Sequence, residues 1–157
     1  LVCRLLLEKE TKKLKSNELS LTYKEHLILI VEDNETNMQI ACLHLDKLKI
    51  PYETAFNGKE AFDKVRNGSF DLILMDCQMP IMDGYEFSME ISKLYLRQPI
   101  IVALTANVLE EDRIKCIKAG MDDFIAKPIK KTLLVEKLDH WVKAGFKQDK
   151  KENRFAS

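Results

Sequence analysis

Two kinds of hydrophobic pattern alternate along the chain from residue 27 onwards. Largely apolar runs of strand length occupy residues 27–31, 71–75 and 99–104, and a shorter segment at residues 51–56 alternates between polar and apolar positions. Between these runs, hydrophobic residues recur at intervals of three and four, as on one face of an α-helix. The pattern therefore predicts strands that alternate with helices, with a short last strand at residues 123–126.

Helices are expected in all the intervals between these strands and after the last one. The predicted helices span residues 35–48, 57–65, 83–94, 107–119 and 129–142. Asn57 and Asn107 each precede a glutamate by three positions, which is the pattern of an N-terminal capping pair. Gly120 is expected to end the fourth helix. In the third helix, the spacing turns three apolar side chains toward the core: Phe87, Ile91 and Leu94.

Strands that alternate with helices require a parallel sheet with right-handed crossovers, which places helices on both faces. Central strands of such a sheet are apolar throughout, as the first, third and fourth strands are here. The alternating second strand belongs at an edge. We therefore predict an α/β fold, a flavodoxin-like doubly wound (βα)5 parallel sheet with strand order 2-1-3-4-5.

Composition and charge narrow the classes of function. The chain has 157 residues, of which 46% are hydrophobic, and it carries 25 basic and 25 acidic side chains. No apolar run approaches the ~20 residues that a membrane span needs, so no membrane contact is expected from this domain. Residues 27–141 hold 14 basic and 19 acidic residues. This acidic centre argues against nucleic-acid binding, which depends on neutralised phosphates.

The four cysteines at positions 3, 42, 77 and 116 form no Cys-x-x-Cys pair and do not cluster with histidines. Neither zinc nor a disulfide is expected, which favours a cytoplasmic location, although a longer parent chain could be membrane-anchored.

Three segments are expected along the chain. Residues 26–143 form the domain, residues 144–157 a polar tail, and residues 1–25 a linker or leading helix. Leucines at positions 7, 14 and 21 hint at a coiled coil, but a linker helix is preferred. The first residue is Leu rather than Met, which favours a piece of a longer chain.

Chemistry-bearing residues follow four of the five strands. Glu32 and Asp33 come after the first strand, Asp76 after the third, Thr105 at the end of the fourth and Lys127 after the fifth. In an open parallel sheet, ligands bind beyond the carboxyl ends of the strands, so these side chains are expected to meet. Taken singly, each has an ordinary explanation as a helix cap, a turn residue or a surface charge. Jointly they suggest a site.

Three carboxylates at one edge repel one another unless a cation lies among them. Oxygen ligands without His or Cys select Mg²⁺, with Mn²⁺ possible. A divalent metal, a lysine and a hydroxyl together suit the oxygens of a phosphoryl group. An aspartate can itself attack phosphorus to give an acyl phosphate.

Four motifs resemble the receiver domain of two-component response regulators over about residues 26–143. They are Val-Glu-Asp-Asn at 31–34, Asp-Leu-Ile-Leu-Met-Asp-Cys-Gln-Met-Pro-Ile-Met-Asp-Gly at 71–84, Ala-Leu-Thr-Ala at 103–106 and Lys-Pro at 127–128. The residues of these motifs are most similar to those in the receivers of hybrid sensor histidine kinases. The resemblance implies a phosphorelay partner, either a histidine kinase or a histidine phosphotransfer protein.

The resemblance also implies a role for each site residue. Asp76 would accept the phosphoryl group, and Lys127 would pair with its oxygens. Asp33 and Asp76 would hold Mg²⁺, with Glu32 acting through water and Gln78 through its backbone carbonyl. Thr105 and Phe124 would form the switch, and the Lys127–Pro128 peptide bond is one that the family often holds cis.

Three other functions that use similar site chemistry or the same fold are disfavoured but remain as alternatives. A phosphatase of the haloacid-dehalogenase type would need a second acid where this chain has Gln78. A flavin carrier would want a hydroxyl- and glycine-rich loop where residues 32–35 read Glu-Asp-Asn-Glu. A receiver-like module that is not phosphorylated would lack the Asp or the Lys. A free-standing single-domain regulator stays open beside the hybrid kinase.

Overall fold

Five parallel strands form one sheet at the centre of the domain. The structure is a computed structural model that describes residues 3–11, 26–94, 98–107 and 109–145. Its strands are β1 (Ile28–Val31), β2 (Tyr52–Ala55), β3 (Leu72–Asp76), β4 (Ile100–Thr105) and β5 (Asp123–Ala126). Their order is β2-β1-β3-β4-β5, all pairs parallel. The predicted fold class is confirmed, and the alternating strand lies at an edge as expected.

Each strand is followed by a helix. The helices are α2 (Glu35–Leu48), α3 (Gly58–Asn67), α4 (Gly84–Leu94), α5 (Glu110–Lys118) and α6 (Lys131–Ala144). Residues 3–11 are also helical, and their side chains are exposed. Of the three leucines at seven-residue spacing, positions 14 and 21 lie outside the described residues. Among the described helices, none combines the length and apolarity that a membrane crossing requires.

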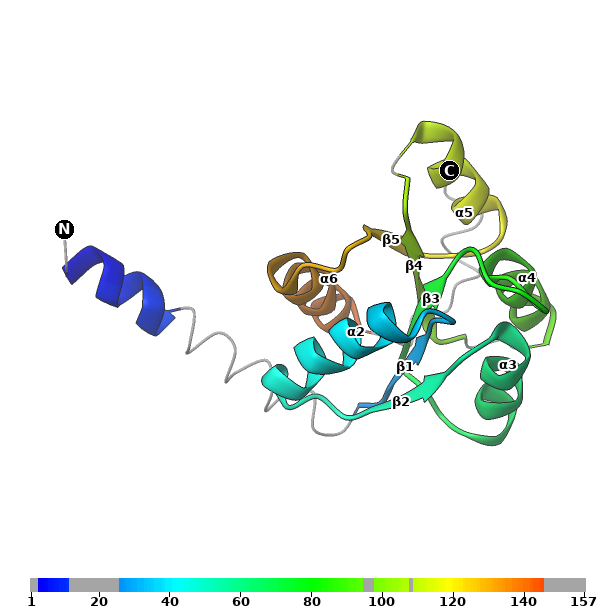
Figure 1. Ribbon diagram of the computed structural model, residues 1–157, viewed down its shortest axis with the longest axis horizontal. Coiled ribbons are helices and arrows are strands. Elements are labelled where there is room, and N and C mark those ends of the chain that lie inside the picture. Colours follow the sequence, from blue (N-terminus) through cyan, green and yellow to red (C-terminus); the bar gives the residue numbers. More distant parts are fainter. Residues whose placement is uncertain (1–2, 12–25, 95–97, 108, 146–157) are drawn as a thin grey trace.

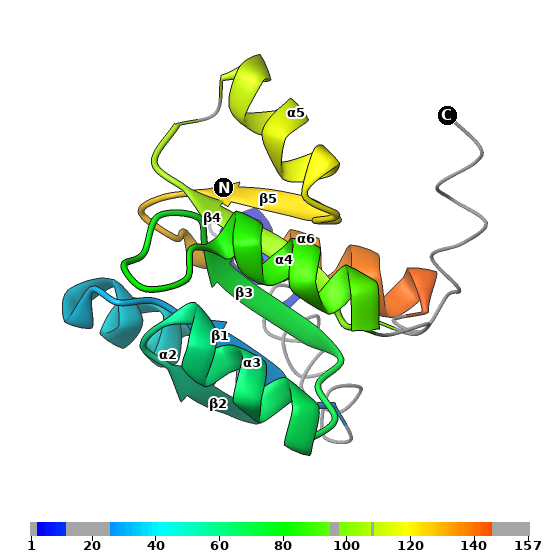
Figure 2. The same ribbon diagram turned by 90° about the vertical axis from the view of Figure 1, so that its right-hand side faces the viewer.

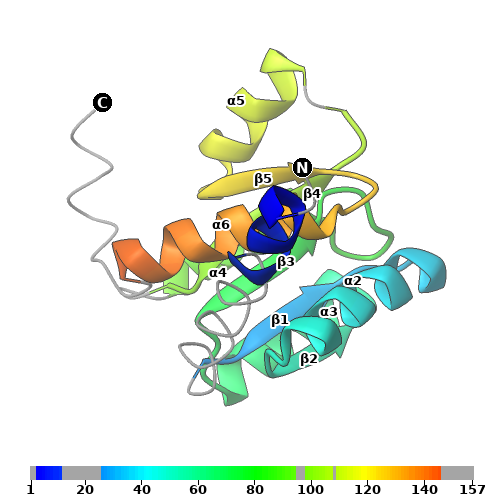
Figure 3. The ribbon, with the colours of Figure 1, turned by 90° about the vertical axis from the view of Figure 1, so that its left-hand side faces the viewer.

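Side chains of the central strands alternate between two apolar layers. In β3, Leu72 and Leu74 pack in a cluster with α2 and α6, whereas Ile73 and Met75 pack with α3 and α4. Figure 2 shows α3 and α4 in front of the sheet, and Figure 3 shows α2 and α6 on the opposite face. Both faces are therefore covered, as the continuous apolar strands require.

Helix α5 is attached to the domain by less apolar burial than the other helices. Cys116 is its only buried residue, and every residue of this helix is described. Ile114 and Ile117 remain 43% and 69% exposed, and Leu109 just before the helix is 63% exposed. Figure 1 shows α5 beside β5, at the edge of the sheet.

Two helix predictions are wrong in detail. Leu94 does not face the core but is 56% exposed, because α4 ends at this residue. Asn107 does not cap α5, whose N-cap is Leu109 without a side-chain hydrogen bond. The backbone of Asn107 instead binds the Thr105 hydroxyl, which holds it in the loop before the helix.

Other predicted helix ends agree with the structure. Asn57 caps α3 by accepting a hydrogen bond from the Glu60 backbone N–H at 2.8 Å. Gly120 follows α5 with a φ of 91°, a left-handed conformation that glycine adopts without strain. These short-range signals succeed because capping depends on residues three or four positions apart.

Candidate functional site

The loops after β1, β3, β4 and β5 meet at one edge of the sheet, because parallel strands end on the same side. They enclose a cleft of about 220 Å³. Six of the seven predicted site residues line it: Glu32, Asp33, Asp76, Gln78, Thr105 and Lys127. Phe124 is not among the lining residues and lies in β5.

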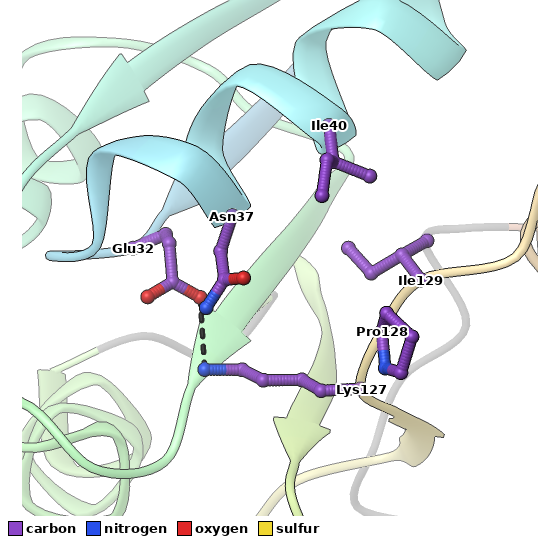
Figure 4. A pocket seen from close by; sticks show the side chains of 6 residues that line it. All are labelled: Glu32, Asn37, Ile40, Lys127, Pro128 and Ile129. Carbon is purple, nitrogen blue, oxygen red and sulfur yellow. Dashed lines mark ion pairs between the residues drawn. The ribbon is translucent and has the colours of Figure 1, made fainter.

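The Lys127 ammonium bridges two buried carboxylates. Its Nζ atom lies 2.8 Å from Asp76 Oδ1 and 2.9 Å from Glu32 Oε2, the second of which is drawn in Figure 4. Asp76 is 3% exposed and Glu32 is 1% exposed. Backbone N–H groups of Gln78 and Asn34 donate to Asp76 Oδ1 at 3.2 Å and to Glu32 Oε1 at 3.1 Å. Shielding from water strengthens these interactions relative to surface ion pairs.

Burial and neighbouring charges shift the pKa values of Glu32 and Lys127. Burial raises the pKa of the Glu32 carboxyl, although the hydrogen bond with Lys127 opposes this effect. Burial alone would lower the pKa of Lys127, but its hydrogen bonds to Asp76 and Glu32 raise it above the ordinary value. Lys127 therefore carries its positive charge at neutral pH.

A third carboxylate completes an acidic cluster. One oxygen from each of Glu32, Asp33 and Asp76 lies within 4.8 Å of the others, and Asp33 is exposed to solvent. Three acids and one lysine leave an excess of negative charge, which a cation would compensate. The donors are hard oxygens without sulfur or imidazole, so the residues present fit Mg²⁺.

Thr105 ends β4 beside the acidic cluster. Its hydroxyl donates a hydrogen bond to the Asn107 carbonyl at 2.7 Å and accepts one from the Asn107 N–H at 3.2 Å. The hydroxyl is therefore engaged by its own loop. The next residue, Ala106, also lines the cleft and has a small side chain.

Phe124 lies in the neighbouring strand, where it is half-buried. The guanidinium carbon of Arg113 lies 4.9 Å from the centre of its ring, and the Lys137 Nζ atom lies 5.4 Å from it. These contacts connect the ring to α5 and α6.

Three further residues that line the cleft had no role in the sequence interpretation: Asn37, Tyr85 and Asp112. A fourth, Asn107, was expected to cap a helix and not to line the cleft. For Asn37 a signal existed, because it stands three positions after Asn34 and thus one turn inside a helix that starts at the cleft. Tyr85 and Asp112 gave no such signal, since they come from the first turns of helices whose tilt only the fold determines.

A small cavity of about 10 Å³ lies beside the Glu32–Lys127 ion pair (Figure 4). Asn37 and Ile40 of α2 line one side, and Pro128 and Ile129 line the other. The Lys127–Pro128 peptide bond is cis, as the resemblance implied. Close by, the His44 Nε2 atom of α2 lies 2.9 Å from the Ile129 carbonyl oxygen, so α2 also contacts the loop that carries Lys127.

Comparison with known sequences identifies one family. The model of the response regulator receiver domain matches residues 28–139. Hybrid signal transduction histidine kinase L of Dictyostelium discoideum is 39% identical over 125 residues, which cover 75% of this chain and 7% of that protein. The aerobic respiration control sensor protein ArcB of Escherichia coli (strain K12) is 43% identical over 104 residues, which cover 65% of this chain and 13% of that protein. The chain thus spans a small part of these relatives.

Solved structures agree in fold. A chain in the co-crystal structure of the Saccharomyces cerevisiae phosphotransfer protein Ypd1 and the receiver domain of Ssk1 matches with a TM-score of 0.68 and 37% identity, covering 74% of this chain and 88% of that chain. The receiver domain of the Pseudomonas aeruginosa PAO1 sensor histidine kinase PA1611, with magnesium in its active-site cleft, matches with a TM-score of 0.68 and 36% identity, covering 75% and 98%. Sequence, topology and acidic cleft together show that this chain belongs to the receiver domains of two-component signalling.

Proposed function

We propose that this receiver domain is a phosphoacceptor switch in which Asp76 takes a phosphoryl group from a phosphohistidine. The proposal rests on the charged groups that surround the Asp76 carboxylate. Its buried carboxylate lies 2.8 Å from the Lys127 ammonium and within 4.8 Å of carboxylate oxygens of Glu32 and Asp33. A single ion pair would satisfy a structural aspartate, whereas the additional acids create repulsion that an incoming cation relieves.

The contacts of Asp76 suggest how the transfer proceeds. Lys127 and the Gln78 N–H both bind Oδ1, so we assign the attack to Oδ2. A lone pair of Oδ2 forms the new O–P bond, the P–N bond of the phosphohistidine breaks, and its electron pair returns to the imidazole. The Lys127 ammonium then offsets negative charge on the phosphoryl oxygens.

The metal is assigned to the same cluster. Asp33, Asp76 and the backbone carbonyl of Gln78 would hold Mg²⁺ directly and Glu32 through water, with Mn²⁺ as an alternative. When bound, the metal would supply positive charge that offsets the negative charge of the carboxylates and of the phosphoryl group. The all-oxygen donor set and the magnesium ion in the PA1611 receiver domain support this assignment.

Phosphorylation would act as a charge switch. The phosphoryl group adds negative charge and acceptor oxygens next to Thr105, whose hydroxyl would leave the Asn107 carbonyl to bind them. Phe124 would then change its rotamer to fill the space that Thr105 vacates. The Thr105–Asn107 hydrogen bond at 2.7 Å is the contact that defines the resting state in this proposal.

The relatives support a proposal for the parent protein. We infer that the chain is the receiver of a hybrid sensor histidine kinase in the cytoplasm, with residues 1–25 as a linker or leading helix, 26–143 as the receiver and 144–157 as a polar tail. Its partner would be a histidine kinase or a histidine phosphotransfer protein, in line with the pairing of Ypd1 and the Ssk1 receiver. A free-standing regulator is the alternative.

Phosphorylation by acetyl phosphate tests the proposal directly. The chain is incubated with acetyl phosphate and Mg²⁺, and its intact mass is measured for wild type, Asp76→Asn and Asp63→Asn. Asp63 is an exposed residue of α3 and serves as the matched control. Wild type and Asp63→Asn should gain one phosphoryl group that hydroxylamine removes, as expected of an acyl phosphate.

Undiminished phosphorylation of Asp76→Asn would overturn the assignment of the acceptor. A parallel incubation with p-nitrophenyl phosphate addresses the phosphatase alternative, because multiple turnovers of that ester would favour an enzyme over a switch.

A further inference from the structure

Two positive charges from different helices lie over the ring of Phe124. The Arg113 guanidinium, 4.9 Å from the ring centre, comes from α5, and the Lys137 ammonium, at 5.4 Å, comes from α6. A cation within ~6 Å of an aromatic ring is attracted by the electron-rich face of the ring. In this position the ring is therefore held by both helices that flank β5.

The two cations are anchored differently. Lys137 donates to Asp123 Oδ1 at 2.7 Å, and the Asp123 carboxylate also accepts hydrogen bonds from the Trp141 indole at 3.0 Å and the Phe124 N–H at 2.8 Å. This network ties Lys137 to β5.

Arg113 has a weaker additional contact, a 3.7 Å ion pair with Glu110 on the same helix. Both side chains are largely exposed, and exposed pairs of this kind contribute little. Arg113 is therefore free to move with α5.

Helix α5 has few other contacts with the domain, so this one contributes a substantial part of its attachment. A further contact joins it to α4, where the Lys115 Nζ atom lies 4.2 Å from the centre of the Tyr85 ring. Cys116 is the only buried residue among its nine, all of which are described, while Ile114 and Ile117 face solvent. Any movement of the Phe124 ring away from Arg113 removes a contact that the helix does not replace elsewhere in the resting structure.

We propose that Arg113 and Lys137 are positioning residues that hold Phe124 in its resting rotamer, and that Arg113 transmits a change of this rotamer to α5. The inference rests on the proposed function. Each cation–ring contact shifts an equilibrium by roughly two- to fivefold, so losing both should favour the switched state by about tenfold. The two contacts thus set how readily the domain switches, and one of them determines which helix responds.

Binding of beryllofluoride, a stand-in for the phosphoryl group, measures this equilibrium. The 157-residue chain is titrated with beryllofluoride in the presence of Mg²⁺, and the fluorescence of Trp141, the single tryptophan, reports binding next to the Asp123 network. Arg113→Gln and Lys137→Met should each bind roughly two- to fivefold more tightly than wild type, and the double variant about tenfold more tightly. Arg113→Lys, which keeps the charge, should return close to wild type.

A matched control exists on another helix. Arg66 lies 6.0 Å from the centre of the Phe62 ring, and both belong to α3. Arg66→Gln removes a contact of the same kind and should leave the affinity for beryllofluoride unchanged.

Fluorination of the ring separates electrostatics from packing. Phenylalanines with increasing fluorine content, incorporated at position 124, weaken cation attraction while they keep the shape of the side chain. Affinity should rise stepwise in the otherwise wild-type chain and stay flat in the Arg113→Gln/Lys137→Met background. A purely structural role of the two cations would not produce this dependence, and hydrogen exchange in α5 should increase along the same series.

Equal affinities of Arg113→Gln and Arg66→Gln, or a flat fluorination series in the wild-type background, would overturn the inference. The proposed function would survive such a result, provided that wild type binds beryllofluoride and Asp76→Asn does not. If wild type fails to bind beryllofluoride with Mg²⁺, the proposed function fails and this inference fails with it.

Discussion

The Lys127 ammonium lies 2.8 Å from the Asp76 carboxylate, although Asp76 ends β3 and Lys127 follows β5, two strands that are not neighbours in the sheet. Strand β4 lies between β3 and β5, and the Lys127 side chain reaches past its end to the buried acid. The same ammonium also contacts Glu32, which follows β1. One cation thus joins the ends of three strands, and this arrangement leads to several measurable expectations.

Replacement of Lys127 by methionine should destabilise the domain in the absence of divalent metal. It leaves Glu32 and Asp76 buried without their cation, and breaking a buried ion pair costs up to about 3–5 kcal/mol, less here because the lysine side chain keeps some exposure. Added Mg²⁺ should recover part of this loss, because the metal can take over the compensation of charge. Urea unfolding with Mg²⁺ and with EDTA measures both effects.

Lys143→Met provides the comparison, since Lys143 lies at the same 2.8 Å from Asp139 but both side chains are largely exposed. The loss of unfolding free energy in Lys143→Met should stay below about 1 kcal/mol and should not depend on Mg²⁺. Equal losses for the two lysines would show that burial of the cluster contributes nothing to its strength.

Asp33→Asn should weaken Mg²⁺ binding without unfolding the domain. Asp33 is the exposed member of the acidic cluster, so its charge can be removed at little cost to the core. Fewer charged oxygen ligands lower the affinity for a divalent cation, here by roughly tenfold or more. Calorimetric titration with MgCl₂ measures the change against Asp63→Asn, and unaltered affinity in Asp33→Asn would remove this residue from the metal site.

Gly84→Ala should disturb the phosphoacceptor through the backbone. A Cβ atom at Gly84 would overlap the Asp76 carbonyl oxygen and lie 2.9 Å from Met75 Cγ, both of which are fixed in β3. Overpacking of this kind costs about 1–3 kcal/mol. The midpoint temperature of thermal unfolding and the rate of phosphorylation by acetyl phosphate should both fall.

Gly68→Ala tests whether any added methyl group has this effect. Its Cβ would lie 3.2 Å from the Lys64 carbonyl oxygen, a tight contact at the end of α3 and away from the cleft. Its phosphorylation rate should match wild type, and a rate as low as that of Gly84→Ala would contradict the backbone argument.

Stability should decrease at alkaline pH through Tyr52. Burial raises the pKa of its phenol above the ordinary value of 10.0, and the hydrogen bond that it donates to Asp46 at 3.0 Å adds to the shift. The unfolded chain loses this proton near pH 10, whereas the folded chain keeps it. The contribution of Tyr52 to the free energy of unfolding is therefore complete below about pH 10 and declines as the pH rises beyond it.

Urea unfolding of wild type and Tyr52→Phe at about pH 8 and pH 11 isolates this contribution. The alkaline loss should be smaller in Tyr52→Phe, because phenylalanine cannot ionise. An identical alkaline loss in both proteins would assign the effect to other groups.

Short-range sequence signals predicted most of the secondary structure and failed near two helix ends. Asn57 caps α3 as expected, but Asn107 does not cap α5, because the Thr105 hydroxyl engages its backbone. Leu94 has the spacing of a core residue, yet α4 ends there and the side chain points to solvent. Residue spacing alone therefore predicted neither outcome, because it does not show where a helix begins or ends.

The pattern of hydrophobic and polar residues was enough to predict the order of strands and helices and the edge at which the acids, Thr105 and Lys127 gather, because alternating strands and helices force a parallel sheet whose carboxyl ends lie together. Which of these groups are in contact became known from the folded arrangement. That Lys127 contacts two acids at once, and that Arg113 and Lys137 meet over Phe124, depends on how helices pack against the sheet. Such contacts join residues far apart in the chain, and no local periodicity encodes the distance between them.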